Sequence, residues 1–280
     1  MADTFTEKDI EAFKPAEKIG LVATVNPQGL PHITLITSIM ACGPDQVTLG
    51  EFSTGKSKEH LRVNPDVAFL VLTMDRKIWR GRATWTHSKK EGPEYEAYND
   101  IPMFRYNAYF GINTVHYLDL KETSGRKKLP LLRIIMSALV TRVFKGKFKG
   151  GQTGQVLKKY AEQSIFNSLS ALKFLSWIGE DGLPRLIPVV QCQAADSGRL
   201  VLFCFPYGTE LAAVPDGTPV AVFALTMVME NVLIRGKFVR KKIIPGLSLA
   251  TVDIDWVYNS MPPCHGQIYP EIPLTAVTAF

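Results

Sequence analysis

Short apolar runs separated by polar turns dominate the first 90 residues, a pattern typical of β-strands. Residues 19–26 form the first predicted strand and end in the turn signal Asn26-Pro27-Gln28-Gly29. Further strands are predicted over residues 31–39, 46–52, 67–74 and 78–86. A short helix fits before Asn64, because Pro65 pushes the preceding residue out of the helical region. The pattern predicts a compact β unit that contains one short helix.

The turn that leads into this helix has the composition of an anion site. It offers the hydroxyl groups of Ser53, Thr54 and Ser57, the Lys56 ammonium group and backbone amides at a helix N-terminus. Unpaired amides and the helix dipole both favour negative charge there. The spaced glycines of a Walker phosphate loop are absent. The structural alternative is a solvated polar helix cap.

A second copy of the β unit follows the first at a constant spacing. Gly29-Leu30-Pro31 recurs 153 positions later at residues 182–184, and the strands at 47–52 and 67–74 recur at the same spacing. Arg80-Gly81-Arg82 resembles Arg235-Gly236-Lys237 at a spacing of 155, which predicts a two-residue insertion. The alternative is coincidence among Val, Ala and Leu strands.

We expect three regions in the chain. The first β copy spans residues 1–120, a basic helical linker spans 121–165, and the second copy with an extended tail spans 166–280. Residues 121–150 carry nine Lys and Arg side chains and one carboxylate, in a chain whose net charge is +6. Helical spacing predicts one packed face in this linker, formed by Leu131, Ile134, Ile135, Ala138 and Leu139. The alternative role for this segment is contact with an acidic partner, such as anionic lipid or nucleic acid.

The two copies differ at the anion turn. Thr54-Gly55-Lys56-Ser57 becomes Tyr207-Gly208-Thr209-Glu210 in the second copy. A lysine is lost, and a carboxylate appears where it would repel a phosphate. We therefore expect the second copy to keep its strands without this anion site.

Taken in sequence order, the predicted hairpin, strand, polar turn, short helix and following strands of the first copy resemble the pyridoxamine 5'-phosphate oxidase-like family of FMN-binding split barrels. The resemblance rests on residues 29–34, 52–56, 61–67 and 80–82, and covers roughly residues 5–90. It implies a mainly β fold with helices (α+β), in which two split β-barrels in tandem form an internal pseudo-dimer. It also implies that FMN lies in the cleft between two barrels.

The resemblance assigns roles to particular residues. Ser53, Thr54, Lys56 and Ser57 would hold the FMN phosphate. The flavin ring would lie along His32, Ile33 and Thr34, and the second copy would supply a facing wall near Arg235. His32 as a plain strand-edge side chain is the structural alternative. No catalytic residue is identified.

These assignments favour an FMN-dependent oxidoreductase that acts on a small molecule, because a flavin supplies its own redox chemistry. The alternative is a non-catalytic split-barrel module that carries or senses a flavin, or that binds haem or a deazaflavin instead.

Composition adds limits on location and partners. The chain is 46% hydrophobic and 21% charged, as in ordinary soluble domains, and no apolar run approaches the ~18 residues of a membrane span. The N-terminus is unlike a signal peptide, and the four cysteines form no CxxC pair. We expect a cytoplasmic protein with no metal site and no nucleic-acid partner. We leave a homodimer open and favour a linker over a membrane contact for residues 121–150.

Overall fold

The computed structural model describes residues 3–52, 55–103, 111–150, 156–244, 247–259 and 266–272. The predicted turn residues Ser53 and Thr54 lie outside this set. The chain separates into two compact units: residues 1–129 with 176–187, and residues 130–175 with 188–280.

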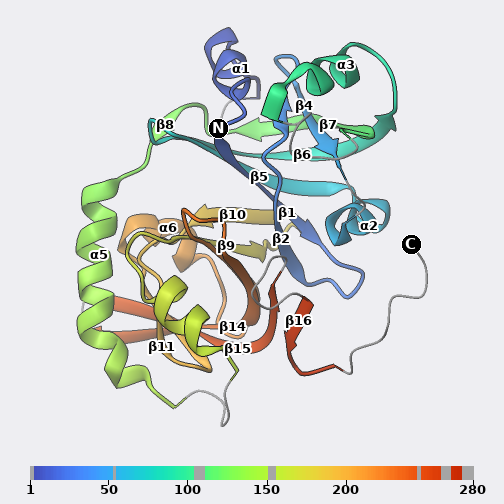
Figure 1. The fold of residues 1–280 in the computed structure, drawn as a ribbon. Coiled ribbons are helices and arrows are strands. Elements are labelled where there is room, and N and C mark those ends of the chain that lie inside the picture. The colour runs from blue at the N-terminus through green and yellow to red at the C-terminus, as the bar shows by residue number, and fades with distance from the viewer. Residues whose placement is uncertain are drawn as a thin grey trace. The chain divides into compact units, whose positions relative to one another are not determined.

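An antiparallel sheet forms most of the first unit (Figure 1). Its path runs β2-β1-β5-β6-β7-β4-β3, and β8 pairs with β6. The strands are β1 Lys18–Val25, β2 Pro31–Leu35, β3 Ile39–Ala41, β4 Gln46–Glu51, β5 Asp66–Thr73, β6 Lys77–Lys89, β7 Thr114–Thr123 and β8 Lys127–Lys128.

The second sheet repeats this path as β10-β9-β13-β14-β15-β12-β11, with β16 paired to β15. Its strands are β9 Leu172–Ile178, β10 Pro184–Pro188, β11 Gln193–Asp196, β12 Arg199–Phe203, β13 Pro219–Leu225, β14 Asn231–Ile244, β15 Leu247–Asn259 and β16 Gly266–Tyr269. The shared strand order confirms the predicted repeat. The fold is mainly β with helices, built from two split β-barrels in tandem.

Short helices connect and cover the strands. They are α1 Glu7–Phe13, α2 Lys56–Val63, α3 Pro93–Asp100, α5 Leu131–Phe144, α6 Gly208–Ala212 and the non-α turns η1 Lys145–Phe148, η2 Ala161–Phe166 and η3 Phe205–Tyr207. A capping box between Thr6 and Asp9 begins α1. As predicted, α2 ends before Pro65, where Asn64 has extended dihedral angles.

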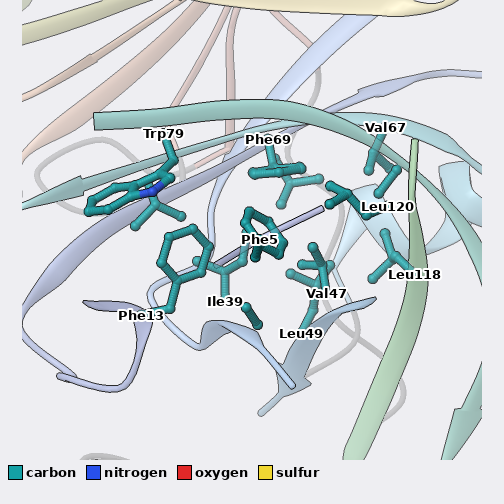
Figure 2. Close-up of a cluster of buried hydrophobic side chains, with 14 of the residues drawn as sticks. Phe5, Phe13, Ile39, Val47, Leu49, Val67, Phe69, Trp79, Leu118 and Leu120 are labelled. Carbon is teal, nitrogen blue, oxygen red and sulfur yellow. The ribbon is translucent and has the colours of Figure 1, made fainter. Parts of the chain in front are cut away.

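An apolar cluster fills the first barrel (Figure 2). Phe13 from α1 packs edge-on against Trp79 of β6, with 5.3 Å between ring centroids. The Trp79 indole N–H donates to the Asp9 carboxylate at 2.8 Å. This bond satisfies the one polar atom of a fully buried tryptophan and fixes α1 on the sheet.

The hairpins β5–β6 and β13–β14 show that the predicted two-residue insertion is wrong. Arg76 and Met229 occupy the same turn position with φ values of 63° and 67°, and their numbers differ by 153. The ladders also correspond, because Phe69 faces Gly81 and Val222 faces Ile234. A strand bulge follows both Arg82 and Arg235. Arg235 is therefore the equivalent of Arg82, and the Arg-Gly dipeptide recurs out of register.

Gly81 has the close backbone approach that its position in a strand predicts. A Cβ atom there would collide with the Phe69 ring and the Glu122 carbonyl oxygen. The missing side chain thus admits the neighbouring β7 backbone and a core ring.

The predicted packed face of α5 is partly wrong. Ile134 and Ala138 are buried together with Ser137 and Thr141, whereas Ile135 and Leu139 are 55% and 53% exposed. The helix packs through small and hydrogen-bonding residues. The Thr141 hydroxyl donates to the Ser137 carbonyl at 2.8 Å and accepts the Phe203 N–H at 3.0 Å.

Candidate functional site

A cavity of about 220 Å³ lies within the first unit. Its wall is formed by β1, β2 and β4, residues 36–38, the α2 helix with the residues before it, and one residue of β7. Figure 1 shows α2 beside β1 and β2. The lining residues are Val22, Thr24, Thr34, Leu35, Ile36, Thr37, Ser38, Leu49, Gly50, Phe52, Gly55, Ser57, Lys58, Leu61 and His116.

The β1–β2 ladder places Thr34 of β2 beside the cavity. Thr34 pairs with Val22, and both line the cavity. Successive strand residues point to opposite faces, so the Ile33 side chain lies on the other face of β2. Of the three predicted ring-contacting residues, Thr34 is the one whose side chain forms the wall.

His32 belongs to a neighbouring buried cluster. It lies opposite Thr24 in the ladder, and its ring meets the His60 ring edge-on with 5.0 Å between centroids. The Thr24 hydroxyl and His60 Nδ1 are 2.9 Å apart. Together these contacts hold α2 against β1 beside the cavity.

Helix α2 brings Ser57 and Lys58 to the cavity and leaves Lys56 exposed. Ser57 is 3% exposed. Leu61 is buried against the core, and Ser57 and Lys58 precede it by four and three positions. Residues at these spacings share one helix face. That spacing is the sequence signal for Lys58, which we did not predict as a site residue.

A buried ionic cluster forms one end of the cavity wall. The Glu51 carboxylate lies 2.9 Å from Lys58 Nζ and 2.6 Å from His116 Nε2. The side chains of Glu51, Lys58 and His116 are 9%, 16% and 11% exposed. At these exposures solvent screens the attraction only weakly.

Burial and pairing act in opposite directions on these three groups. Burial alone raises the pKa of Glu51, but hydrogen bonds from His116 and Lys58 outweigh it and leave that pKa lowered. Burial lowers the pKa of His116, although Glu51 opposes this shift. Burial also lowers the pKa of Lys58 despite the same carboxylate. Glu51 is thus ionised at neutral pH, and His116 favours its neutral form.

One atom of this cluster lacks a partner. Among the described residues, His116 Nδ1 is buried and makes no hydrogen bond. When the other ring nitrogen donates to Glu51, Nδ1 is an acceptor. A ligand hydroxyl or N–H in the cavity would satisfy it.

The second unit lacks this cluster. At the spacing of 153, Glu51 and Lys58 correspond to Cys204 and Leu211. His116 faces Leu49 across the ladder, and Ala250 faces the equivalent Leu202. All three charged or titratable cavity groups are replaced by an uncharged or apolar residue.

Arg235 lies in the second unit, on β14. Its guanidinium stacks over the Trp256 ring at 3.9 Å from the centroid, and burial lowers its pKa. In the first unit, the equivalent Arg82 instead pairs with Glu122. A role for Arg235 as a wall of the flavin site stays a prediction.

The architecture is that of a split β-barrel. Residues 6–124 match the family model of pyridoxamine 5'-phosphate oxidase. The first β copy is thus similar to the pyridoxamine 5'-phosphate oxidase family, and the second copy repeats its strand order. The matched segment contains the cavity and its ionic cluster. No curated protein matches the chain in sequence.

Several solved structures are similar to part of the chain. An FMN-binding protein from Syntrophomonas wolfei is 16% identical with a TM-score of 0.36, covering 44% of this chain and 86% of its own. HupZ from Group A Streptococcus is 17% identical with a TM-score of 0.35, covering 42% and 91%. An F420 reductase is 18% identical with a TM-score of 0.34, covering 42% and 98%.

Proposed function

We propose that the first unit binds FMN in this cavity and that the protein is an oxidoreductase acting on a small molecule. One observation carries the proposal: the cavity opens at the N-terminus of α2, inside the family-matched segment, with Ser57 and Lys58 on its wall. Such a helix N-terminus favours phosphate binding through its free amides and its dipole.

The wall groups suit the parts of this ligand. The Lys58 ammonium group and the Ser57 hydroxyl are donors for a phosphate. His116 Nδ1 and the Thr34 hydroxyl can accept hydrogen bonds from a ribityl chain. Leu35, Ile36 and Phe52 give the remaining wall an apolar character.

The size of the cavity fits part of such a ligand. Sites for drug-sized molecules occupy roughly 300–1,000 Å³, whereas the cavity measures about 220 Å³. It therefore accommodates the phosphate and part of the polyol, with the ring outside it. Ser53 and Thr54, the other proposed phosphate ligands, lie outside the described residues, and Lys56 would act from the exposed start of α2.

Glu51 should lower the affinity of the cavity for an anion. Its carboxylate already neutralises Lys58, so an arriving phosphate competes with it for the same ammonium group. Protonation of His116 would compensate the added negative charge. The bound flavin would supply the redox chemistry, while the chain binds and orients it.

The same ion pair favours a second candidate function. Because Lys58 is already paired with a buried carboxylate, the cavity can also suit a ligand without a phosphate. The protein would then be a non-catalytic binding module, or would hold haem or a deazaflavin.

The absorbance spectrum and mass of the small molecule that copurifies with the full chain separate these candidates. Flavin absorbance with the mass of FMN supports the proposal. A Soret band, the mass of a deazaflavin, or a colourless protein that binds no added FMN would each contradict it. Turnover with a reduced nicotinamide and an electron acceptor then tests the oxidoreductase claim.

A further inference from the structure

Helix α5 exposes large apolar side chains to solvent. They are Leu132, Ile135, Met136, Leu139 and Val143, exposed by 73%, 55%, 56%, 53% and 74%. The helix packs against β11 and β12 of its own unit through its opposite side. A surface helix normally turns polar residues outward, so α5 has an unpartnered apolar face.

The five residues form one continuous stripe. Their spacings after Leu132 are three, four, seven and eleven positions, which place them on one side of a helix at ~100° per residue. The buried residues Ile134, Ser137, Ala138 and Thr141 occupy the opposite side. Five large apolar side chains thus face solvent, whereas Ile134 and three small or hydrogen-bonding residues face the sheet.

Cations border the stripe on both sides. Arg133 follows Leu132 and Arg142 precedes Val143, so at ~100° per residue they flank the stripe in opposite directions. Both are exposed. Arg133 also lies 5.9 Å from the ring centroid of Phe205, which is itself 55% exposed.

The turn after the helix extends the positive charge. Lys147 and Lys149 are exposed, whereas Lys145 donates to Asn167 at 2.5 Å. Residues 130–150 contain no Asp or Glu. The segment therefore combines an apolar stripe with positive charge and contains no carboxylate of its own.

We propose that α5 binds the surface of an anionic lipid bilayer, lying in the plane of the headgroups. The apolar stripe enters the headgroup–acyl boundary to ~5–10 Å, and the flanking cations contact lipid phosphates. At ~1.5 Å per residue the helix is about 21 Å long, too short to cross a ~30 Å hydrocarbon layer. Within the described residues, no helix has the length and hydropathy of a membrane span.

The pattern of charge and apolar surface on α5 favours an anionic bilayer over a second copy of the chain or a nucleic acid. A second copy docked through the same stripe would bring two sets of cations together with no acidic residue from either helix. A nucleic acid would neutralise the cations but leave five aliphatic side chains uncovered. An anionic bilayer covers both the stripe and its rim.

Cosedimentation of the full chain with vesicles tests the proposal. The vesicles contain phosphatidylcholine alone or phosphatidylcholine with phosphatidylglycerol. We expect binding to the anionic vesicles, weakened by salt and far weaker on phosphatidylcholine alone. Arg133→Gln with Arg142→Gln should reduce partition into the anionic vesicles roughly 25-fold, at about fivefold per cation. Arg133→Lys with Arg142→Lys should retain binding, because both positive charges remain.

The apolar stripe is tested separately. Ile135→Gln with Leu139→Gln should lower partition at least tenfold, because both side chains leave the acyl boundary. Met74→Gln is the matched control, since Met74 is 69% exposed on the other unit. Circular dichroism and melting should match the wild type, because the changed residues are exposed.

Four results would overturn the proposal: no binding to anionic vesicles at low salt, binding that ignores the stripe variants, equal loss in Met74→Gln, or self-association in sedimentation velocity that the stripe variants abolish. The last result would assign the face to a second copy. Because none of these measurements involves FMN, failure here leaves the proposed flavin site untouched.

Discussion

Glu51 and Lys58 form a buried ion pair that joins the end of β4 to the first turn of α2, with 2.9 Å between carboxylate oxygen and ammonium nitrogen. The pair belongs to the cavity wall, where His116 gives the carboxylate a second partner at 2.6 Å. Removing one charge would leave the other desolvated and unpaired. Changes to this pair should therefore affect both the stability of the cavity wall and its affinity for anions.

Lys58→Ala should weaken FMN binding more than Lys56→Ala. A charge-assisted hydrogen bond contributes about 1.5–3 kcal/mol, so the loss for Lys58 is roughly 10- to 100-fold. Lys56 is exposed, so solvent screens its attraction to a phosphate and its contribution to FMN affinity is smaller. Fluorescence titration of FMN measures both, with Thr209→Ala, the second-copy equivalent of Lys56, as the control. Equal affinity in wild type and Lys58→Ala would refute the site assignment.

The ion pair itself should appear in the free energy of unfolding. Lys58→Met leaves the Glu51 carboxylate with His116 alone and should cost about 2–3 kcal/mol. Adding Glu51→Gln should recover part of that loss, because the unpaired charge is then gone. A double-mutant cycle in urea measures the coupling, expected at about 1–3 kcal/mol. Strictly additive effects would show that the two side chains do not interact in solution.

His116 should make stability depend on pH. Burial lowers its pKa, so its contribution is complete above the unfolded value of about 6.5 and is lost as pH falls through the lower folded value. The lowered pKa of Glu51 adds a further loss at more acidic pH. His116→Gln should therefore show a shallower fall in melting temperature between pH 7.5 and 5.5 than the wild type. Parallel curves would contradict this account.

Strand and turn signals predicted most of the fold because the relevant forces are local. The turn at Asn26 and the helix end before Pro65 follow from the backbone preferences of these residues. The corresponding strands of the two copies are separated by a constant 153 positions, which predicts the repeat. The α5 prediction was partly wrong because helical spacing shows which residues share a face, but not which of two apolar faces meets the sheet. Hydrogen bonds to the sheet mark the buried face: Thr141 accepts the Phe203 N–H, and the Ala138 carbonyl accepts from Gln193.

The site was harder to predict than the fold. Lys56 stood out in sequence because it lies in the polar turn, yet Lys58, two positions later, reaches the cavity because it shares the Leu61 face of α2. Glu51 and His116 are 65 residues apart, and only the β4–β7 ladder brings them together. The match of Arg235-Gly236 to Arg80-Gly81 misled because a dipeptide recurred two positions out of register.

Lys173 in the second unit gives a different pH signal. The side chain is fully buried, its ammonium group donates to the Ser168 carbonyl, and burial lowers its pKa from 10.5 to about 8. The charged form is thus penalised in the folded state below pH 8, and the penalty disappears as pH rises to 10.5. Relative to Lys173→Met, which does not titrate, the wild type should gain roughly 3 kcal/mol over this range. Urea unfolding at pH 7.5 and 10 checks the direction, and an unchanged difference would contradict it.

Cofactor content should be one FMN per chain, because the two units differ at every charged group of the cavity. Cys204, Leu211 and Ala250 replace Glu51, Lys58 and His116, and Glu210 stands where Ser57 lies in the first copy. A phosphate in the second unit would meet the Glu210 carboxylate at the position that Ser57 holds in the first unit, and two negative groups at close range repel each other.

The count is best made on a species shown to be monomeric by sedimentation velocity, with FMN released by denaturation and measured by absorbance. We expect one FMN per chain in the wild type and in Leu211→Met, and far less than one in Lys58→Met. Two FMN per chain would contradict the asymmetry of the repeat. Loss of FMN in step with dissociation of a dimer would show that a second chain completes the site, and that a single chain does not hold the cofactor alone.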